Sequence, residues 1–468
     1  MKNLSLLALV ICAGLPLAAQ AVAVSGLTVS KGDANVTLYG VLDAGVARVD
    51  HTLGFETGNS ELVNPTANKV GNTAAIGMFN GGISPSRWGL KGGVGIVDGY
   101  RAIFLLESAI NVPNGTVSNA AQTVAQSTGS TGSQFSSNDS ANSGQLFARG
   151  AYLGVESTQY GTLTFGRQQS LMLDLIGDFD AVQGAQSFSP LGYSGSYGGG
   201  GATDDSRLDN AVKYKIKYAG FNLGLQHKFG GVTNNANTGS AEQVTLGYEN
   251  GPFAVQAAYQ GNKDATSISN NYAAAQTLTV GGVTYTIPAS SGVKATFEDT
   301  VSYSLMARYL VGKWAIRGGY QKQEFTNPSN PGADSQVTSL YGQSVTAVSV
   351  TPFTVNGGNV QKDLNVYWIG ASYDVTSKLN LAAGYYQVDQ NNYSNHAAFA
   401  NQAASGKSKY DSILVDYHFT KAVDCYLGYM VNVVSGGMAN SGAAGTKVAA
   451  NYIYSNNSII GLGGRLKF

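Results

Sequence analysis

Hydrophobic and polar side chains alternate along much of the chain, and segment 206–219 shows this pattern most clearly. Most even-numbered positions of the segment are apolar and most odd-numbered positions are charged, and we call each such alternate set of positions a parity. The apolar positions are Leu208, Val212, Tyr214, Ile216 and Tyr218, and the charged positions are Arg207, Asp209, Lys213, Lys215 and Lys217. A period of two predicts a β-strand with two chemically different faces. Alone, the segment is compatible with a soluble β-sandwich or with a β-barrel in lipid.

Comparable segments recur over the whole chain and predict sixteen strands. Parity leaves the faces of four of them open, namely 99–109, 146–156, 362–373 and 423–433. The predicted strands are 35–49, 83–94, 99–109, 146–156, 161–167, 206–219, 220–229, 241–249, 252–261, 299–310, 313–324, 362–373, 377–388, 407–418, 423–433 and 455–468.

The connections between these strands alternate in length. Links of a few residues, such as Ala219-Gly220, alternate with long loops rich in Gly, Ser, Asn and Thr. The long loops lie near 50–82, 110–145, 168–205, 230–240, 262–298, 325–361, 389–406 and 434–454. Short turns at one end and long loops at the other indicate an up-and-down transmembrane barrel. Tyrosines near strand ends, such as Tyr259, Tyr309 and Tyr320, fit an aromatic girdle, although aromatic residues also fill sandwich cores.

Composition and the N-terminal residues indicate the cellular compartment and the class of protein. The chain has 468 residues, a formal net charge of zero and 12% charged residues, which argues against a disordered chain and against a nucleic-acid partner. The first 23 residues combine Lys2, an apolar run and small residues at Ala19, Ala21 and Ala23, as secretory signal peptides do. No later apolar run is long enough for a transmembrane helix. We therefore expect residues 1–23 to be a signal peptide and residues 24–468 to be one exported β-barrel.

Several motifs resemble, in the same order, those of the general porins of Gram-negative outer membranes, especially the beta-proteobacterial branch. They are VTLYGVLDAGV at 36–46, SRWGLKG at 86–92, RAIFLLES at 101–108, RGAYLGVES at 149–157, YGTLTFGRQ at 160–168, RLDNAVKY at 207–214 and GLGGRLKF at 461–468. The resemblance implies a porin of the cell outer membrane, with a water-filled channel for passive diffusion of small hydrophilic solutes and ions. It also implies a homotrimer, contacts with the lipid bilayer and lipopolysaccharide, and insertion by the outer-membrane assembly machinery.

Porins fold their third external loop into the barrel, where it faces arginines on the opposite wall. By this resemblance we expect an all-β fold, a 16-stranded antiparallel transmembrane β-barrel with an inward-folded third loop at 168–205. Parity independently places Arg87 and Arg207 on the polar face, whereas the lumen placement of Arg149 follows from the resemblance and from the cost of a charge in lipid. The expected pore constriction consists of Arg87, Arg149, Arg207, Asp174, Asp178 and Asp180.

Further basic residues are expected to line the lumen, and the C-terminal residue has a separate role. The basic lining leads to the hypothesis that the pore prefers anions, although the negative charge of loop carboxylates could cancel this preference. The resemblance implies that Phe468 is a signal for the assembly machinery, and its apolar parity on the last strand also fits a position facing lipid. The other expected lumen-lining residues are Lys91, Arg101, Lys213, Lys215, Arg308 and Arg317.

No pattern in the sequence indicates an enzyme. The four histidines, His51, His227, His396 and His418, lie in no distinctive catalytic motif, and neither a phosphate-binding loop nor a zinc-protease motif occurs. We therefore expect no catalytic residues, no cofactor and no metal. The alternatives to a general pore are a substrate-specific outer-membrane channel and, less favoured, a plugged barrel of the adhesin type, which would conduct little.

Overall fold

The computed structural model describes a barrel and parts of its loops. The described residues are 26–52, 70–117, 146–192, 206–231, 236–269, 276–280, 283–287, 294–330, 339–340, 343–344, 354–355, 358–393, 405–436 and 456–468. The predicted signal peptide at 1–23 lies outside them. None of the helices in these segments is long and apolar enough to cross a membrane.

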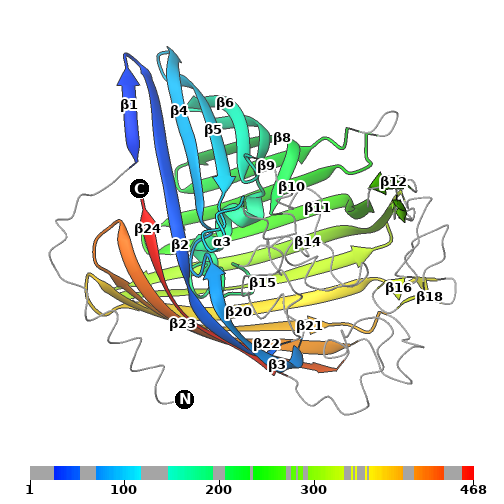
Figure 1. Ribbon diagram of the computed structural model, residues 1–468. Helices are drawn as coiled ribbons and strands as arrows, with labels where there is room; N and C mark the ends of the chain where they lie inside the picture. The colour runs from blue at the N-terminus through cyan, green and yellow to red at the C-terminus, as the bar shows by residue number, and fades with distance from the viewer. Residues whose placement is uncertain are drawn as a thin grey trace.

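A single antiparallel sheet closes on itself to form the barrel (Figure 1). From β5 to β23 each wall strand pairs with the wall strands before and after it in the chain, and β24 closes the ring by pairing with β2. The wall strands are β2 (Ala34–Thr52), β3 (Val70–Asn80), β4 (Arg87–Val97), β5 (Tyr100–Ala109), β6 (Gly150–Ser157), β7 (Gly161–Gln169), β8 (Arg207–Tyr218), β9 (Phe221–Lys228), β10 (Ala241–Asn250), β11 (Phe253–Ser269), β14 (Lys294–Val311), β15 (Trp314–Thr326), β20 (Lys362–Asp374), β21 (Leu379–Gln390), β22 (Gly406–His418), β23 (Val423–Gly436) and β24 (Asn456–Lys467).

The barrel has sixteen strand positions because two of these strands share one place. Both β3 and β4 pair with β2, β3 with its second half and β4 with its first half. The short strand β1 (Leu27–Lys31) also pairs with the start of β2, beyond the point where β24 ends. The predicted 16-stranded antiparallel barrel is thus confirmed.

The two faces of the wall have the chemistry that the alternation predicted. On β14, Tyr303, Leu305 and Tyr309 are exposed on the outer surface, whereas Ser302 and Ser304 are buried on the inner side. A barrel of this kind satisfies every backbone N–H and C=O of its wall between strands, which is a requirement for spanning lipid. The short turns lie at one end of the ring, and the strand ends that lead into the long connections lie at the other (Figure 1).

The structure differs from the prediction in the region 50–87. We expected a loop at 50–82 and a strand from residue 83, but β3 occupies 70–80 and an irregular segment separates it from β4. The buried carboxylate of Asp43 on β2 holds this break, because it accepts hydrogen bonds from the backbone N–H groups of Gly82, Ile83 and Ser84 at 2.8–3.1 Å. The alternation in β3 was missed because Gly, Asn, Thr and Ala dominate its first half.

Helix α3 (Leu171–Phe179) and three small hairpins complete the described elements. The helix begins in the third long connection, where the sequence predicted only a loop. The hairpins are β12 (Gln276–Val280) with β13 (Val283–Ile287), β16 (Ser339–Leu340) with β17 (Gln343–Ser344), and β18 (Thr354–Val355) with β19 (Gly358–Asn359).

The C-terminal residue fastens the closing seam. The backbone N–H of Gly40 donates to the carbonyl oxygen of Phe468 at 2.8 Å, and the N–H of Phe468 donates back to Gly40 at 3.0 Å. The ring of Phe468 lies over Gly40, in the space that a side chain at that position would occupy. Glycine at position 40 therefore makes room for the terminal ring.

Gly40→Ala should weaken the seam. Its Cβ would meet the Phe468 ring and would lie 3.0 Å from the carbonyl oxygen of Arg87. Overpacking of this kind costs typically about 1–3 kcal/mol, so we expect a lower urea midpoint for unfolding of the purified barrel in detergent. Gly464→Ala is the matched control, because its nearest neighbouring atom lies 3.6 Å away. Equal losses in both variants would contradict this account of the seam.

Candidate functional site

The segment 170–192 follows the inner wall of the barrel. Helix α3 starts at Ser170, whose hydroxyl oxygen accepts a hydrogen bond from the N–H of Leu173 at 3.1 Å and caps the helix. Figure 1 shows α3 within the ring of strands. The helix lies against β9, β10, β11, β14 and β15, on the side where the wall residues are polar.

The second half of this segment is anchored to β20–β24 by side chains of the wall. Trp368 Nε1 donates to the carbonyl oxygen of Phe179 at 2.9 Å, and Ser412 Oγ donates to that of Phe188 at 2.5 Å. The ring of Phe188 also packs edge-on against Phe79 and Tyr426. An apolar core therefore forms inside the barrel and fills this side of the lumen.

Asp180 stabilises the loop and does not face the aqueous path. The residue is completely buried. Its carboxylate accepts hydrogen bonds from the N–H groups of Val182 and Gly184 and from the hydroxyls of Ser189 and Tyr386, at 2.7–3.1 Å. Burial raises the pKa of this carboxyl, and the four hydrogen bonds oppose that rise. We therefore remove Asp180 from the predicted constriction.

Asp174 on α3 pairs with two lysines of β8. Its Oδ2 lies 2.6 Å from Lys213 Nζ and 2.9 Å from Lys215 Nζ. The Lys213 ammonium is buried, and it also donates to the carbonyl oxygen of Gln169 at 3.0 Å. Lys215 is half exposed, so one positive charge of this group remains in contact with water.

Asp178, at the end of α3, contacts two arginines of the adjacent wall strands β14 and β15. Its carboxylate lies 3.3 Å from Arg308 Nη1, and its carbonyl oxygen accepts from Arg317 Nε at 3.1 Å. The carboxylate is two-thirds exposed. Arg308 also pairs with Glu249 at 2.9 Å, and Arg317 donates to Ser372 Oγ at 3.0 Å.

Arg87, Arg149 and Arg207 lie together around Glu107. Arg149 Nε donates to Glu107 Oε1 at 2.7 Å, and Arg87 Nε lies 3.5 Å from Oε2. Arg207 Nε donates to the carbonyl oxygen of Arg149 at 3.3 Å, and no described carboxylate pairs with it. Arg149 and Arg207 are only 6% and 2% exposed. Arg149 precedes β6 and is not part of it, although we expected a strand from residue 146.

The arrangement of the predicted constriction residues is thus different from the expected one. The three arginines lie together, but Asp174 and Asp178 of the loop pair with Lys213, Lys215 and Arg308 instead of these arginines. Fixed charges of both signs still line the inner wall, at two separate places.

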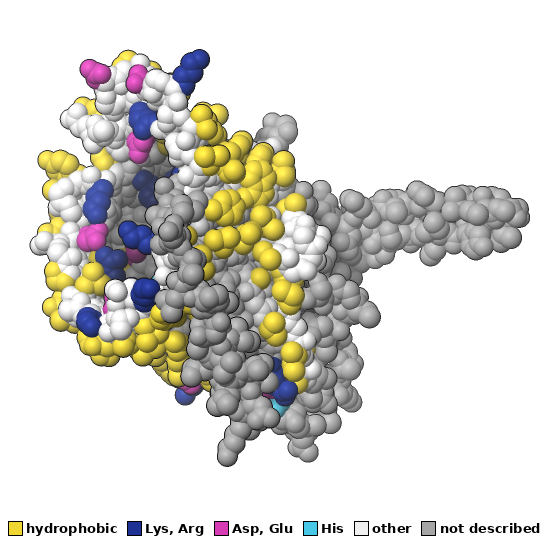
Figure 2. All heavy atoms as spheres, turned by 60° about the vertical axis from the view of Figure 1, so that its left-hand side comes forward, with side chains coloured by type: hydrophobic (Ala, Val, Ile, Leu, Met, Phe, Trp, Pro, Cys, Tyr) yellow, Lys and Arg dark blue, Asp and Glu magenta, His cyan; other side chains and the backbone are white. Residues whose placement is uncertain are grey.

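The remaining predicted lumen residues lie toward the end that carries the short turns. Lys91 is exposed, with its Nζ 5.0 Å from the centre of the Tyr39 ring. Arg101 is half-buried on the same face of β5 as Glu107, and neither Lys91 nor Arg101 pairs with a described carboxylate. Figure 2 looks at this end and shows a hollow with many Lys and Arg side chains, beside an apolar outer surface. The hollow is therefore basic.

Sequence reasoning missed several charged residues of the inner wall, among them Glu249 and Arg167. Glu249 bridges Lys217 at 2.6 Å and Arg308 at 2.9 Å, and its shared parity with Gln243 and Thr245 could have revealed it. Arg167 pairs with Asp209 at 2.5 Å. Strict alternation with Leu163 and Phe165 would place Arg167 on the lipid side, and the register shift between Gly166 and Gln168 that changes its face cannot be read from the pattern.

Comparisons with known proteins give one consistent result. Residues 5–346 match the family described as Gram-negative porin. An outer membrane porin protein of Bordetella pertussis is 27% identical over 407 residues, which cover 80% of this chain and 93% of that protein. An anion-selective porin from Comamonas acidovorans has a TM-score of 0.55 at 18% identity, covering 93% and 100% of the two chains. The trimer form of OmpT from Vibrio cholerae has a TM-score of 0.52 at 19% identity, covering 93% and 99%.

The chain therefore belongs to the Gram-negative porin family. It is a β-barrel of the cell outer membrane and forms a channel for passive diffusion. The likeness to the two solved structures supports the fold.

Asp180→Ala should loosen the loop inside the barrel. The substitution leaves two backbone N–H groups and two hydroxyls without their acceptor, and each unmet buried group costs about 1–3 kcal/mol. We expect more frequent current fluctuations in single-channel records and a lower urea midpoint. Asp98→Ala, in an exposed short turn, is the control. If current fluctuations are as rare in Asp180→Ala as in the control, the loop is held by its other contacts.

Proposed function

We propose that this porin prefers small hydrophilic anions. The observation that carries the proposal is the basic hollow at the short-turn end, where Lys91 and Arg101 have no described carboxylate partner and Lys215 remains half exposed. Fixed charges of one sign in a lumen with low-dielectric walls raise the local concentration of ions of the opposite sign. Chloride and carboxylate solutes should therefore pass more readily than potassium.

Selection by size and polarity would follow from the inner loop. Segment 179–191 fills the side of the lumen next to β20–β24, and Asp174 of α3 is paired with Lys213 and Lys215 of β8, so the water path is expected between the loop and the strands β4–β7. Arg87 would face this path, the charges of the buried Arg149 and Arg207 would act on it at longer range, and Asp174 and Asp178 would face it from the loop. Opposed fixed charges across a narrow aperture order water and orient polar solutes, whereas apolar solutes must disrupt that water.

The assembly is proposed by family resemblance. We infer removal of residues 1–23, insertion by the outer-membrane assembly machinery with Phe468 as signal, and a homotrimer surrounded by lipid bilayer and lipopolysaccharide. The trimer form of OmpT from Vibrio cholerae, which has a similar fold, supports the homotrimer. The pairing of Phe468 with Gly40 gives the terminal aromatic residue a structural role besides any recognition.

One observation favours the alternative of a plugged barrel. The apolar contacts of Phe188 and its neighbours close part of the lumen. Single-channel conductance of the refolded protein in a planar bilayer separates the two functions. For the proposed channel we expect large ohmic conductance steps. Across a potassium chloride gradient, the reversal potential should lie nearer the equilibrium potential of chloride than that of potassium. Folded protein that produces no steps would support the plugged barrel.

Charge substitutions on the inner wall should move the reversal potential in opposite directions. Lys91→Gln removes a positive charge that has no described carboxylate partner, so the chloride preference should fall. Asp178→Asn removes an exposed carboxylate beside Arg308, so the preference should rise. Arg48→Gln is the control, because Arg48 lies on the outer face and pairs with Asp50. A shift in the control as large as that of Lys91→Gln would contradict selection by lumen charges.

A further inference from the structure

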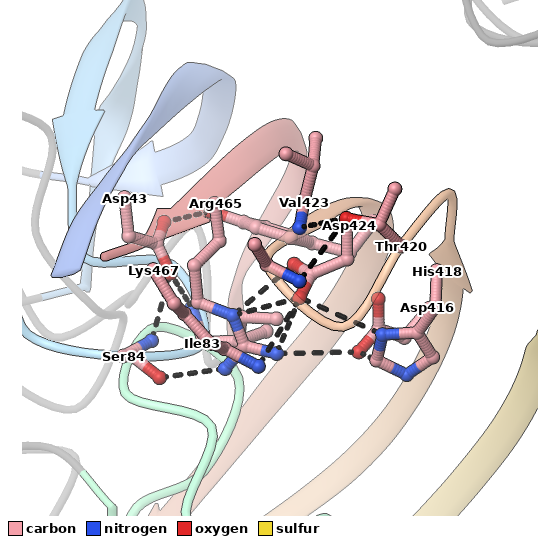
Figure 3. A network of polar contacts seen from close by, with 12 residues as sticks. Asp43, Ile83, Ser84, Asp416, His418, Thr420, Val423, Asp424, Arg465 and Lys467 are labelled. Atoms are coloured by element: carbon pink, nitrogen blue, oxygen red, sulfur yellow. Dashed lines mark hydrogen bonds and ion pairs between the residues drawn. The ribbon is translucent and has the colours of Figure 1, made fainter. Parts of the chain in front are cut away.

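A compact cluster of metal-ligand side chains lies at the short-turn end of β22 and β23. Asp416 and His418 end β22, and Asp424 faces them from the start of β23 (Figure 3). His418 and Asp424 are direct partners in the strand register. The turn between them is fixed by Thr420, whose Oγ1 accepts hydrogen bonds from the N–H groups of Ala422 at 3.1 Å and Val423 at 3.0 Å. The three side chains are therefore held together by rigid elements.

Asp416 has a buried oxygen atom without a hydrogen-bond partner. The residue is 9% exposed, and its Oδ1 contacts no donor among the described residues. Buried polar atoms normally have a partner, and an unpaired carboxylate oxygen is costly. Its Oδ2 has two loose ion-pair contacts, at 3.5 Å to His418 Nε2 and 3.6 Å to Arg465 Nη2. The Asp416 carboxylate therefore has one oxygen without a hydrogen-bond donor and one with only long ion-pair contacts.

The donor atoms have spacings that suit a small cation. One ligand atom from each of Asp416, His418 and Asp424 can be chosen so that all lie within 4.8 Å of one another. The nearest pairs are Asp416 Oδ2 with His418 Nε2 at 3.5 Å, and Asp424 Oδ2 with His418 Nδ1 at 3.6 Å. Donors of a tetrahedral zinc ion with bonds of about 2.0–2.1 Å lie about 3.3 Å apart. His418 can give only one of its two ring nitrogens to an ion, so the side chains must move to bring the three donor atoms from within 4.8 Å of one another to that spacing.

Arg465 and Lys467 compete for the same carboxylates. Arg465 Nη2 lies 2.9 Å from Asp424 Oδ2, and Lys467 Nζ lies 3.4 Å from it. Their charges must lower the affinity for any metal ion. Arg465 has a second anchor, because its Nη1 donates to Ser84 Oγ at 2.7 Å (Figure 3), so it can leave the carboxylates without losing every contact. The His418 side chain is 35% exposed, which gives an ion access from water.

We propose that Asp416, His418 and Asp424 bind a divalent first-row transition-metal ion, such as Zn²⁺, which displaces Arg465 from the two carboxylates. One imidazole and two carboxylates suit Zn²⁺ better than Mg²⁺ or Ca²⁺, which take all-oxygen sites. The site departs from the sequence prediction of no metal, because the three residues converge only when β22 and β23 pair. Binding at this site is independent of the proposed ion preference.

The test is calorimetric titration of the tag-free, folded protein in detergent with Zn²⁺. We expect one ion per chain, with affinity lowered at least about tenfold in His418→Gln and in Asp416→Asn, since even loss of an outer-shell partner costs about 10–100-fold. Arg465→Gln should bind more tightly, because it removes the competing charge. His51→Gln is the matched control, since His51 Nδ1 lies 2.7 Å from Asn456 Oδ1 and His51 is not part of this cluster.

A second readout is the visible absorption of Co²⁺, which reports tetrahedral coordination by nitrogen and oxygen and should be lost in His418→Gln. Heat-dependent gel mobility establishes that each variant is folded. The proposal is overturned if the wild-type protein binds no Zn²⁺ at millimolar concentration. It is equally overturned if folded His418→Gln and Asp416→Asn both titrate like the wild type, or if only His51→Gln loses binding.

Discussion

The need to pair every backbone hydrogen-bonding group in a medium without water determines this structure. A sheet in lipid has no tolerable edge, so the first wall strand must meet the last. The chain meets this demand with one long strand, β2, that pairs with β24 along one side and with β3 and β4 along the other. The reciprocal hydrogen bonds between Gly40 and Phe468 lie at the end of that seam.

The interior is not simply a water-filled tube. The loop that enters it carries apolar residues, and the wall strands opposite supply Trp368, Tyr386 and Tyr426, so a hydrophobic core forms where the alternation alone would predict polar lining. Many charged groups, such as Arg87, Arg149 and Lys213, occupy the other side, and a second charged cluster around Asp424 lies on β22–β24 at the short-turn end. Division of the lumen into a packed side and a charged side allows one loop to be held rigidly while the solute path stays polar.

Much of the fold could be predicted from the sequence, because lipid on one side and water on the other impose a period of two on each strand. The exceptions have physical reasons. Strand β3 has too few large apolar residues for its faces to differ clearly, and the register shift beside Arg167 reverses the face of a charged residue. The site was less predictable. Asp180 could not be distinguished from an aperture carboxylate, because its partners are backbone groups of its own loop and a tyrosine 206 positions away. The path of the loop along the wall decides which Lys or Arg side chain pairs with Asp174 or Asp178. That path cannot be predicted from the alternation of residues.

The attachment of the inner loop has a consequence for how this barrel can diverge. Trp368, Ser412 and Arg317 hold the loop by donating to the carbonyl oxygens of Phe179, Phe188 and Asp178. A carbonyl oxygen is present whichever residue carries it, so these anchors do not depend on the side chains at those loop positions. Exposed loop side chains such as Asp178 can then be exchanged during evolution, and the solutes that pass can change, while the same wall residues keep the loop in place.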